Sequence, residues 1–343
     1  MAGTANQYPS LKNTILTGII REFKTDTSVF TGAPWCPIVG ARPGTDTIEW
    51  DIVTGVQGMT PAVYPNAPSP IKAHPGVGHK SFKTVQWREK FVFDETDLMY
   101  LRTPGTWDTA YGNQMIADRM GDLNVRIETR LEYLRWQMLT GTITITYPDT
   151  KTQAVDYEVP SGNKPTVSTL WSDATNADAV SDVGAWKFLF RGTPVKAGKL
   201  VMNQFTYNYL PAMTKIRNLI QYQFGYDLVR SGGLVPMGAV GEALGGLPIE
   251  INDSGYVNDS AAFTPFLADK KVLVLPASTP EKWCEFLSTT NMHHGGQTPQ
   301  AGKFARPIWK LDDDPISVEV LGGIYGLPVM YHTDWHIYAT VAS

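Results

Sequence analysis

The sequence predicts an α+β protein, in which one long helix lies against a sheet and a mixed α/β segment follows. Three observations predict this class. Apolar residues recur at helical spacing over about 109–140, segments of alternating polarity stand on both sides of that stretch, and short helical and strand-like runs follow Pro160. With 343 residues, 43% of them hydrophobic and 18% charged, the chain is long and apolar enough to bury a large core.

Residues 1–44 predict an arm that lies over another part of the structure. The segment "PSLKNTILTGIIREF" (9–23) has the spacing of a short amphipathic helix. The segment "TGAPWCPIVGARPGTD" (31–46) is rich in turn-forming residues, so a compact domain is not expected there.

Residues 47–53 and 82–93 alternate between apolar and polar side chains, and they predict the two legs of a long hairpin. Between these legs the segment "TPAVYPNAPSPIKAHPGVG" contains five prolines from Pro61 to Pro75. Structureless segments of this length are uncommon inside compact domains and usually serve a function. We therefore expect the tip of the hairpin to contact something outside its own chain.

The stretch over about 109–140 is the clearest element of the sequence. It contains no proline, Gly141 follows where a C-terminal cap belongs, and Asp122 and Arg126 have the spacing of an i,i+4 pair. A coiled-coil dimer would also show such a stripe, but complementary flanking charges are missing, which favours a sheet of the same chain as the partner. The predicted buried stripe consists of Ile116, Met120, Leu123, Ile127, Leu131, Leu134 and Met138.

The segments after this helix alternate between strands and helices. The sequence predicts a hairpin over 142–159, a helix over 178–192, a strand over 199–204, a helix over 205–225, and strands over 247–253 and 270–276. The strands within 315–342 are expected to rejoin the sheet beneath the long helix.

The charge and cysteine content exclude several classes of protein. A formal net charge of -4 and a pI near 5.9 do not indicate a general binder of nucleic acid or membranes. Cys36 and Cys284 are too few for a disulfide framework, so a reducing compartment is expected. The sequence shows no secretion signal and no run of eighteen apolar residues, so we expect a cytosolic protein without a membrane span.

Catalytic and cofactor motifs are missing from the sequence. Phosphate loops, His-Glu-x-x-His, Gly-x-Ser-x-Gly and dinucleotide fingerprints are absent, and no cofactor is predicted. His332, Asp334 and His336 would share one face of a strand and could offer two imidazoles and a carboxylate to a metal. An exposed polar face without metal is the favoured interpretation, because no other ligand cluster supports a metal site. We therefore predict that the protein is not an enzyme.

Five segments of the sequence carry a resemblance to a known family. "TRLEYLRWQMLTGTITI" and "VDYEV" contain a helix end, a glycine and a hairpin, "WSDATNADAVSDVGAWKF" precedes "KLVMNQFTYNYL", and "LPVMYHTDWHIYATV" covers residues 327–341. In these segments the sequence resembles the major capsid proteins of tailed bacteriophages, in particular the lambda-like major capsid protein E family. The likeness covers nearly all of the chain through diffuse patterns.

The resemblance implies the Hong Kong 97-type capsid fold and a division into four parts. These parts are an N-terminal arm at 1–44, an extended loop at 45–95, a peripheral domain with its spine helix at 96–160 and 301–343, and an axial domain at 161–300. The loop tip would then rest on an adjacent subunit, and stiffening by proline would reduce the entropy that docking costs. The expected contact residues of the tip are Pro61, Tyr64, Pro65, Pro68, Pro70, Ile71, Lys72 and Pro75.

The resemblance also implies a function and a set of partners. The chain would assemble in the host cytoplasm into pentamers and hexamers of an icosahedral virion head that holds double-stranded DNA by weak, non-specific contact. It would need a portal protein and a separate scaffolding protein, because no scaffolding segment is visible; a decoration protein is left open. The alternatives are an encapsulin-like nanocompartment shell and a metal-dependent hydrolase that uses His332, Asp334 and His336.

Overall fold

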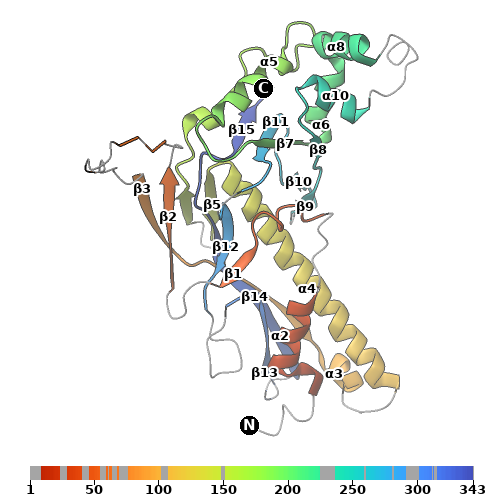
Figure 1. Ribbon diagram of the computed structural model, residues 1–343. Coiled ribbons are helices and arrows are strands. Elements are labelled where there is room, and N and C mark those ends of the chain that lie inside the picture. Colours follow the sequence, from red (N-terminus) through yellow and green to blue (C-terminus); the bar gives the residue numbers. More distant parts are fainter. Residues whose placement is uncertain are drawn as a thin grey trace. The chain divides into compact units, whose positions relative to one another are not determined.

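The computed structural model divides the chain into two compact units, each built from three segments (Figure 1). The first unit contains Met1–Trp50, Ser81–Arg135 and Cys284–Val329, and the second contains Asp51–Lys80, Trp136–Trp283 and Met330–Ser343. The structure describes residues 9–23, 29–40, 46–54, 59–60, 62–63, 68, 76–101, 107–147, 151–224, 236–258, 260–279, 282–290, 301–310, 312 and 315–342. No helix in the described part of the chain has both the length and the apolarity needed to cross a bilayer.

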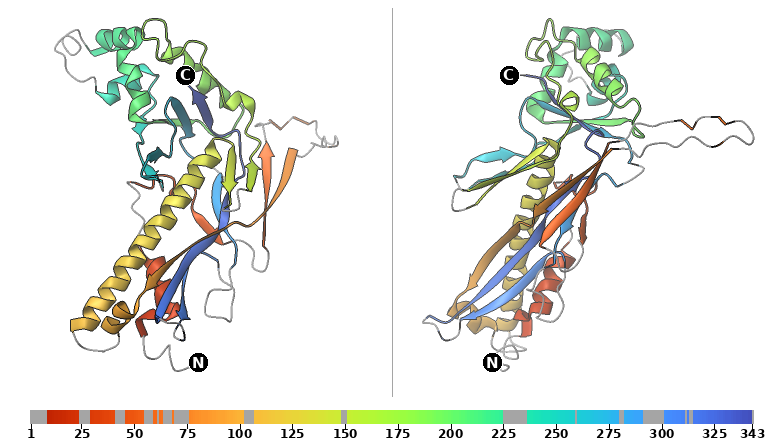
Figure 2. Two further views of the ribbon diagram at one scale, coloured as in Figure 1. Left: turned by 180° about the vertical axis from the view of Figure 1, so that it is seen from behind. Right: turned by 90° about the vertical axis from the view of Figure 1, so that its left-hand side faces the viewer.

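A five-stranded sheet forms the body of the first unit. Its strands run in the order β1-β12-β14-β13, and β4 pairs with β14 from Val318↔Phe93 to Tyr325↔Gln86. The pairing of β1 with β12 is parallel, whereas β4 and β13 run antiparallel to β14; Figure 2 shows these long strands side by side. The strands are β1 (Ile38–Gly40), β4 (Gln86–Phe93), β12 (Cys284–Ser288), β13 (Phe304–Lys310) and β14 (Ser317–Met330).

The N-terminal segment packs on this sheet through a short amphipathic helix. Leu16, Thr17 and Ile20 form the buried face of this helix, and the Thr17 hydroxyl donates to the Ala305 carbonyl at 2.9 Å. The amphipathic helix predicted within 9–23 is thereby confirmed. The helices that begin in the first unit are η1 (Pro9–Leu11), α2 (Asn13–Glu22), α3 (Glu95–Leu101) and α4 (Trp107–Leu139).

The helix α4 has 33 residues and is about 50 Å long. All seven residues of its apolar stripe, from Ile116 to Met138, are buried. Gly141 adopts φ +94°, and its N–H bonds to the Met138 carbonyl at 2.9 Å, as a glycine cap does. The helix lies against β14, because a Cβ atom at Gly322 would overlap Leu123. The sheet of the first unit therefore contacts the stripe at Leu123.

One charge pair predicted on α4 was wrong. Arg126 does not pair with Asp122 on its own helix; its guanidinium bonds to the Glu89 carboxylate of β4 at 2.6 Å. Spacing of i,i+4 brings two side chains within reach, but a carboxylate on the adjacent strand competes for the same guanidinium.

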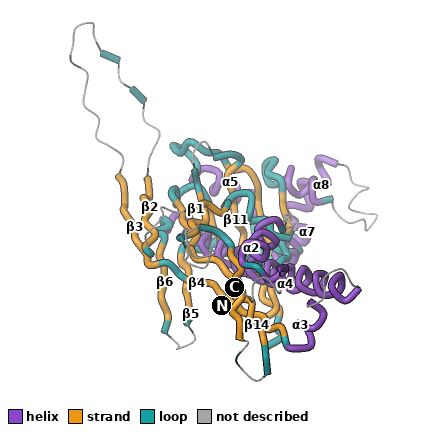
Figure 3. Tube along the Cα trace, turned by 90° about the horizontal axis from the view of Figure 1, so that it is seen from below, coloured by secondary structure: helices purple, strands orange, loops and turns teal. Residues whose placement is uncertain are grey.

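The predicted long hairpin needs a correction in its second leg. β2 (Thr47–Thr54) pairs with β3 (Gly76–Lys83) in a separate two-stranded sheet, and Figure 3 shows the two strands side by side. The alternating segment 82–93 is mostly β4, which belongs to the five-stranded sheet. The buried Val85 separates β3 from β4, and its carbonyl accepts from the Gly326 N–H at 3.0 Å. Alternation predicts a strand but not its partner.

The second unit is built around a four-stranded sheet in the order β15-β11-β7-β8. β15 pairs antiparallel with β11, so only β14 of the two C-terminal strands joins the sheet against α4, and the prediction for β15 was wrong. Two hairpins, β5–β6 and β9–β10, complete the strands. The bounds are β5 (Thr142–Thr146), β6 (Thr152–Asp156), β7 (Ala197–Met202), β8 (Ile249–Ile251), β9 (Gly255–Val257), β10 (Phe263–Pro265), β11 (Lys271–Pro276) and β15 (Ile337–Thr340).

The helices of the second unit differ from the prediction over 205–225 and at Met237–Ala243, where no helix was predicted. The helix expected over 205–225 is divided into three pieces, because Asn208 and Met213 interrupt it and Pro211 has no N–H to donate. Met213 is extended, with ψ 131°. The bounds are η2 (Ser161–Asn163), α5 (Ala179–Leu189), α6 (Gln204–Tyr207), α7 (Tyr209–Ala212), α8 (Thr214–Phe224) and α10 (Met237–Ala243).

Replacing Leu131 by aspartate should prevent folding, because the change buries a carboxylate without a partner in the stripe of α4, where Leu131 is fully buried. The expected loss is several kcal/mol of unfolding free energy. Soluble yield and helical circular dichroism measure it. The control is Val125→Asp on the same helix, where the side chain is 51% exposed and the change should be tolerated. If the Leu131 variant were as soluble and helical as its parent, the stripe would have to face solvent.

Candidate functional site

The hairpin β2–β3 carries the segment predicted to contact a neighbouring subunit. Of the predicted contact residues, Pro68 is exposed, and Pro61, Tyr64, Pro65, Pro70, Ile71, Lys72 and Pro75 lie outside the described residues. Two apolar side chains from the same segment are also exposed, Met59 at 94% and Val63 at 42%. The described residues between β2 and β3 thus present their side chains to solvent.

Large apolar side chains are exposed on four helices of the second unit. Tyr222 on α8 is 92% exposed and Phe188 on α5 is 58% exposed. Exposed apolar side chains that are scattered singly are normal, whereas a contiguous patch of them marks a contact surface. The further members are Leu189, Phe205, Leu219 and Met237.

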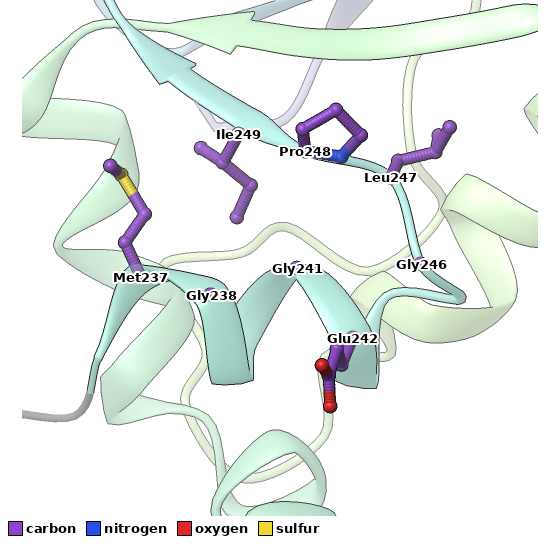
Figure 4. A pocket seen from close by; sticks show the side chains of 8 residues that line it. All are labelled: Met237, Gly238, Gly241, Glu242, Gly246, Leu247, Pro248 and Ile249. Carbon is purple, nitrogen blue, oxygen red and sulfur yellow. The ribbon is translucent and has the colours of Figure 1, made fainter.

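A shallow hollow of about 340 Å³ lies between α10 and the start of β8 (Figure 4). Its wall is mostly apolar, and Gly238 and Gly246 leave room because a Cβ at either position would meet no atom within 4 Å. The only charged lining residue is Glu242, whose carboxylate points away from Ile249 (Figure 4). With a mostly apolar lining, the hollow suits an apolar contact rather than a reaction.

The run His332, Asp334 and His336 lies in the connection between β14 and β15, and the exposed polar face predicted for it was wrong. His332 is 7% exposed, and its ring stacks on Trp335 with centroids 3.8 Å apart. His336 is fully buried, and its Nε2 lies 3.0 Å from the Leu139 carbonyl, so Nε2 carries the hydrogen. In the described part of the chain, no three His, Cys, Asp or Glu side chains are grouped to hold a metal.

Burial controls the protonation of these groups. It lowers the pKa of His336 from 6.5 to about 4, and it raises the pKa of the Asp334 carboxyl. Both cysteines are buried thiols, and burial raises the pKa of Cys36 to about 12 and that of Cys284 well above its usual value. A thiol that stays protonated is a poor nucleophile. These residues therefore pack and bond in the interior.

The sequence analysis missed a cluster of buried polar side chains on α4. Asn124, Glu128, Glu132 and Arg135 are all at most 3% exposed, and Lys303 meets two of them from the segment before β13. Their spacing of four, four and three residues is that of a helical stripe, one position after the apolar stripe. This spacing is the feature of the sequence from which the buried polar cluster could have been predicted.

The chain matches the family model described as phage major capsid protein E over residues 42–341. The chain belongs to this family. As a member it is a phage major capsid protein, a structural component of the virion capsid rather than an enzyme. The prediction drawn from the resemblance is confirmed at this level.

Solved structures support the fold. The protein is similar to a putative capsid protein of a prophage in Escherichia coli CFT073, with 17% identity, a TM-score of 0.57, and coverage of 78% of this chain and 80% of the other. It is also similar to a phage-related protein from Bordetella bronchiseptica RB50, with 11% identity, a TM-score of 0.57, and coverage of 97% and 98%. The α+β Hong Kong 97-type fold is thereby confirmed. No curated protein matches the sequence.

Replacing His336 by glutamine should reduce the loss of stability in acid. Between about pH 6.5 and about pH 4 the unfolded chain binds a proton that folded His336 excludes, so the unfolding free energy decreases as pH falls, by roughly 3 kcal/mol. Glutamine keeps an N–H donor for the Leu139 carbonyl but does not titrate. Urea unfolding across this pH window measures the effect.

The control for this prediction is His79→Gln, because the His79 side chain is 61% exposed and bonds to Asp51 at the surface. At neutral pH this variant should unfold at the same urea concentration as its parent, which shows that a change of histidine to glutamine is tolerated at an exposed position. An unchanged pH dependence in the His336 variant would contradict the assignment of the acid sensitivity to this imidazole.

Proposed function

We propose that this capsid protein forms pentamers and hexamers of an icosahedral phage head that encloses double-stranded DNA. The observation that carries the proposal is the match to the capsid family over residues 42–341. Closed shells are built from repeated contacts between identical subunits, and such contacts need surfaces that the single chain leaves open.

Two described surfaces support contacts between copies. The first is the β2–β3 hairpin with the exposed Met59, Val63 and Pro68, which we assign to the extended loop at 45–95. The second is the exposed apolar set of the second unit, including Phe188 and Tyr222, which falls in the proposed axial domain at 161–300. Burying one such side chain contributes roughly 1.5–3 kcal/mol to the free energy of association. Several together would hold the subunits of a pentamer or hexamer around its symmetry axis.

The other parts and partners follow from the same proposal. Residues 1–44 would be the arm, and 96–160 with 301–343 the peripheral domain whose spine is α4. A separate scaffolding protein and a portal protein would direct assembly in the host cytoplasm, and a decoration protein could bind the finished head. With a net charge of -4 the protein would contact packaged DNA weakly and without sequence preference.

Electron microscopy of the expressed protein tests this function. Closed icosahedral shells, or rings of five and six subunits, are expected. A monomer that stays dispersed at all protein and salt concentrations would overturn the proposal. The alternative in the same fold is a nanocompartment shell; a stoichiometric protein cargo found inside purified shells by mass spectrometry would favour it.

Shortening the loop tip should prevent assembly while leaving the subunit folded. In the proposed variant, residues 61–75 are replaced by an Asn-Gly pair, so β2 and β3 stay joined by a shorter loop. Closure entropy changes slowly with loop length, so the unfolding free energy should change by about 1 kcal/mol or less. Contacts with the neighbouring subunit would be lost, and shells should be absent, malformed or fragile.

A matched control replaces the same residues by a Gly-Ser segment of equal length, which separates the effect of length from that of the side chains. Chemical unfolding and electron microscopy are the two measurements. Normal shells from the shortened variant would refute the role of the tip, and failure of that variant to fold would place the segment in the subunit's own core.

A further inference from the structure

The pairing of β1 with β12 brings the two cysteines of the chain together. The parallel register aligns Ile38 with Phe286, and Cys36 and Cys284 stand two positions earlier on the same two segments. This register extends beyond β1, because the Phe286 N–H donates to the Pro37 carbonyl at 2.8 Å. Side chains two positions apart on a strand share a face of the sheet. The register therefore places the two cysteines side by side.

The spacing of neighbouring strands suits a bond between these cysteines. Adjacent strands lie about 4.7–4.9 Å apart. The Cα atoms that a disulfide joins are usually about 4.4–6.8 Å apart. Both thiols are free and buried, with exposed fractions of 0% for Cys36 and 3% for Cys284. Burial raises the pKa of Cys284 well above its usual value, and Cys36 adds to that rise, so the two groups are close enough to interact.

The N-terminal arm is attached to the sheet at this point by a small number of hydrogen bonds. The strand β1 has three residues and stands at the edge of the sheet, with β12 as its neighbour. The Cys36 carbonyl accepts from the Arg135 Nε of α4 at 3.1 Å, and the Cys36 N–H donates to the Gly32 carbonyl at 3.0 Å. Short terminal segments open more easily than the core of a unit. A covalent bond here would join the arm to β12.

The two thiols differ in which one can act as the nucleophile. Burial raises the pKa of Cys36 to about 12, and the Arg135 guanidinium opposes this rise through its charge and a hydrogen bond. For Cys284, Cys36 and Glu285 both add to the effect of burial. The guanidinium thus favours Cys36 as the first thiol to ionise. Because both thiols stay mostly protonated near neutral pH, their oxidation should be slow.

We propose that Cys36 and Cys284 form an intrachain disulfide when the folded protein meets hydrogen peroxide. The Cys36 thiolate attacks one oxygen of the peroxide, the O–O bond breaks, and the hydroxide that leaves takes up the proton lost from Cys36. Cys36 is then a sulfenic acid. The Cys284 sulfur attacks the Cys36 sulfur, the S–O bond breaks, and water leaves with the Cys284 proton. In sum, two thiols are oxidised to one disulfide and one hydrogen peroxide is reduced to two waters.

The bond would form at a particular stage in the life of the capsid protein. A reducing cytosol keeps buried thiols unlinked, so the chain folds with both cysteines free. After release into an oxidising medium, the disulfide would hold the N-terminal arm on β12 and oppose its detachment. This timing rests on the proposed function, because a phage head leaves the cell in which it was assembled.

Thiol alkylation and peptide mapping of the peroxide-treated protein test the proposal. When the folded protein is exposed to hydrogen peroxide and then denatured, alkylation should fall from two labels to none, and it should return to two after reduction. A tryptic digest without reductant should contain residues 25–72 joined to residues 283–303. Three results would overturn the proposal: thiols that still alkylate after long exposure, cysteines oxidised without a link, or a disulfide that joins two chains.

Urea unfolding measures what the bond does to the subunit. The oxidised protein should unfold at a urea concentration roughly 1 M higher than the reduced protein, because the disulfide restricts the unfolded chain. Addition of a reductant should remove this difference. An oxidised protein that carries the bond but unfolds at the same urea concentration as the reduced protein would contradict the stabilising role.

The variant Cys36→Ala is the matched control, because peroxide also oxidises methionine and the chain has eleven of them. This variant should form no linked peptide, and reductant should leave its urea midpoint unchanged after peroxide treatment. Cys284→Ala should behave in the same way. If either variant is insoluble, the peptide map of the wild-type chain alone decides whether the bond exists.

The test separates the disulfide from the proposed head function. The bond is detected in the denatured single chain, whereas assembly is detected by electron microscopy of the native protein. A linked chain that builds no shells would contradict the head function and leave the disulfide standing. Shells built from chains that never link would contradict the disulfide alone.

Discussion

The buried charges of α4 are the constraint on which the first unit depends. Glu128 and Glu132 lie inside the protein, where a carboxylate without a partner costs several kcal/mol. Their partners come from distant parts of the chain: Lys303 from the segment before β13, and the Gly32 N–H from the N-terminal arm. A Cβ at Gly32 would lie 2.8 Å from the Glu132 carboxylate, so glycine is needed there. The helix α4, the N-terminal arm and the segment before β13 must therefore fold together.

The elements that the sequence predicted correctly are those in which the spacing of apolar residues shows which side chains are buried. α4, the β5–β6 hairpin and the strand β7 lie where periodicity and turn residues predict them. Predictions of which strands pair with each other were less accurate. The alternation over 82–93 cannot reveal that β4 pairs with β14, and nothing near β15 reveals that it pairs with β11. Pairing depends on residues far away in sequence.

The candidate site was predictable only in part. Exposure in the β2–β3 segment follows from its composition, but most of the predicted tip contacts lie outside the described residues and stay predictions. The histidines near the end of the chain show the opposite case, since polarity suggested an exposed face whereas His336 is bonded inside the protein. The polar stripe beside the apolar stripe of α4 had a readable spacing, but polar residues on a helix normally indicate a solvated face.

The parallel pairing of β1 with β12 has a consequence for how the chain acquires its structure. Ile38 pairs with Phe286, about 250 positions further along the chain, and Trp87 pairs with Ile324 across a similar span. Contacts between such remote segments raise the contact order, which slows folding. On a ribosome, which adds roughly 5–20 residues per second, the N-terminal segment would wait for nearly the whole polypeptide before its strand partner emerges. The first unit can therefore be completed only at the end of synthesis, and an unfinished chain cannot present it to another subunit.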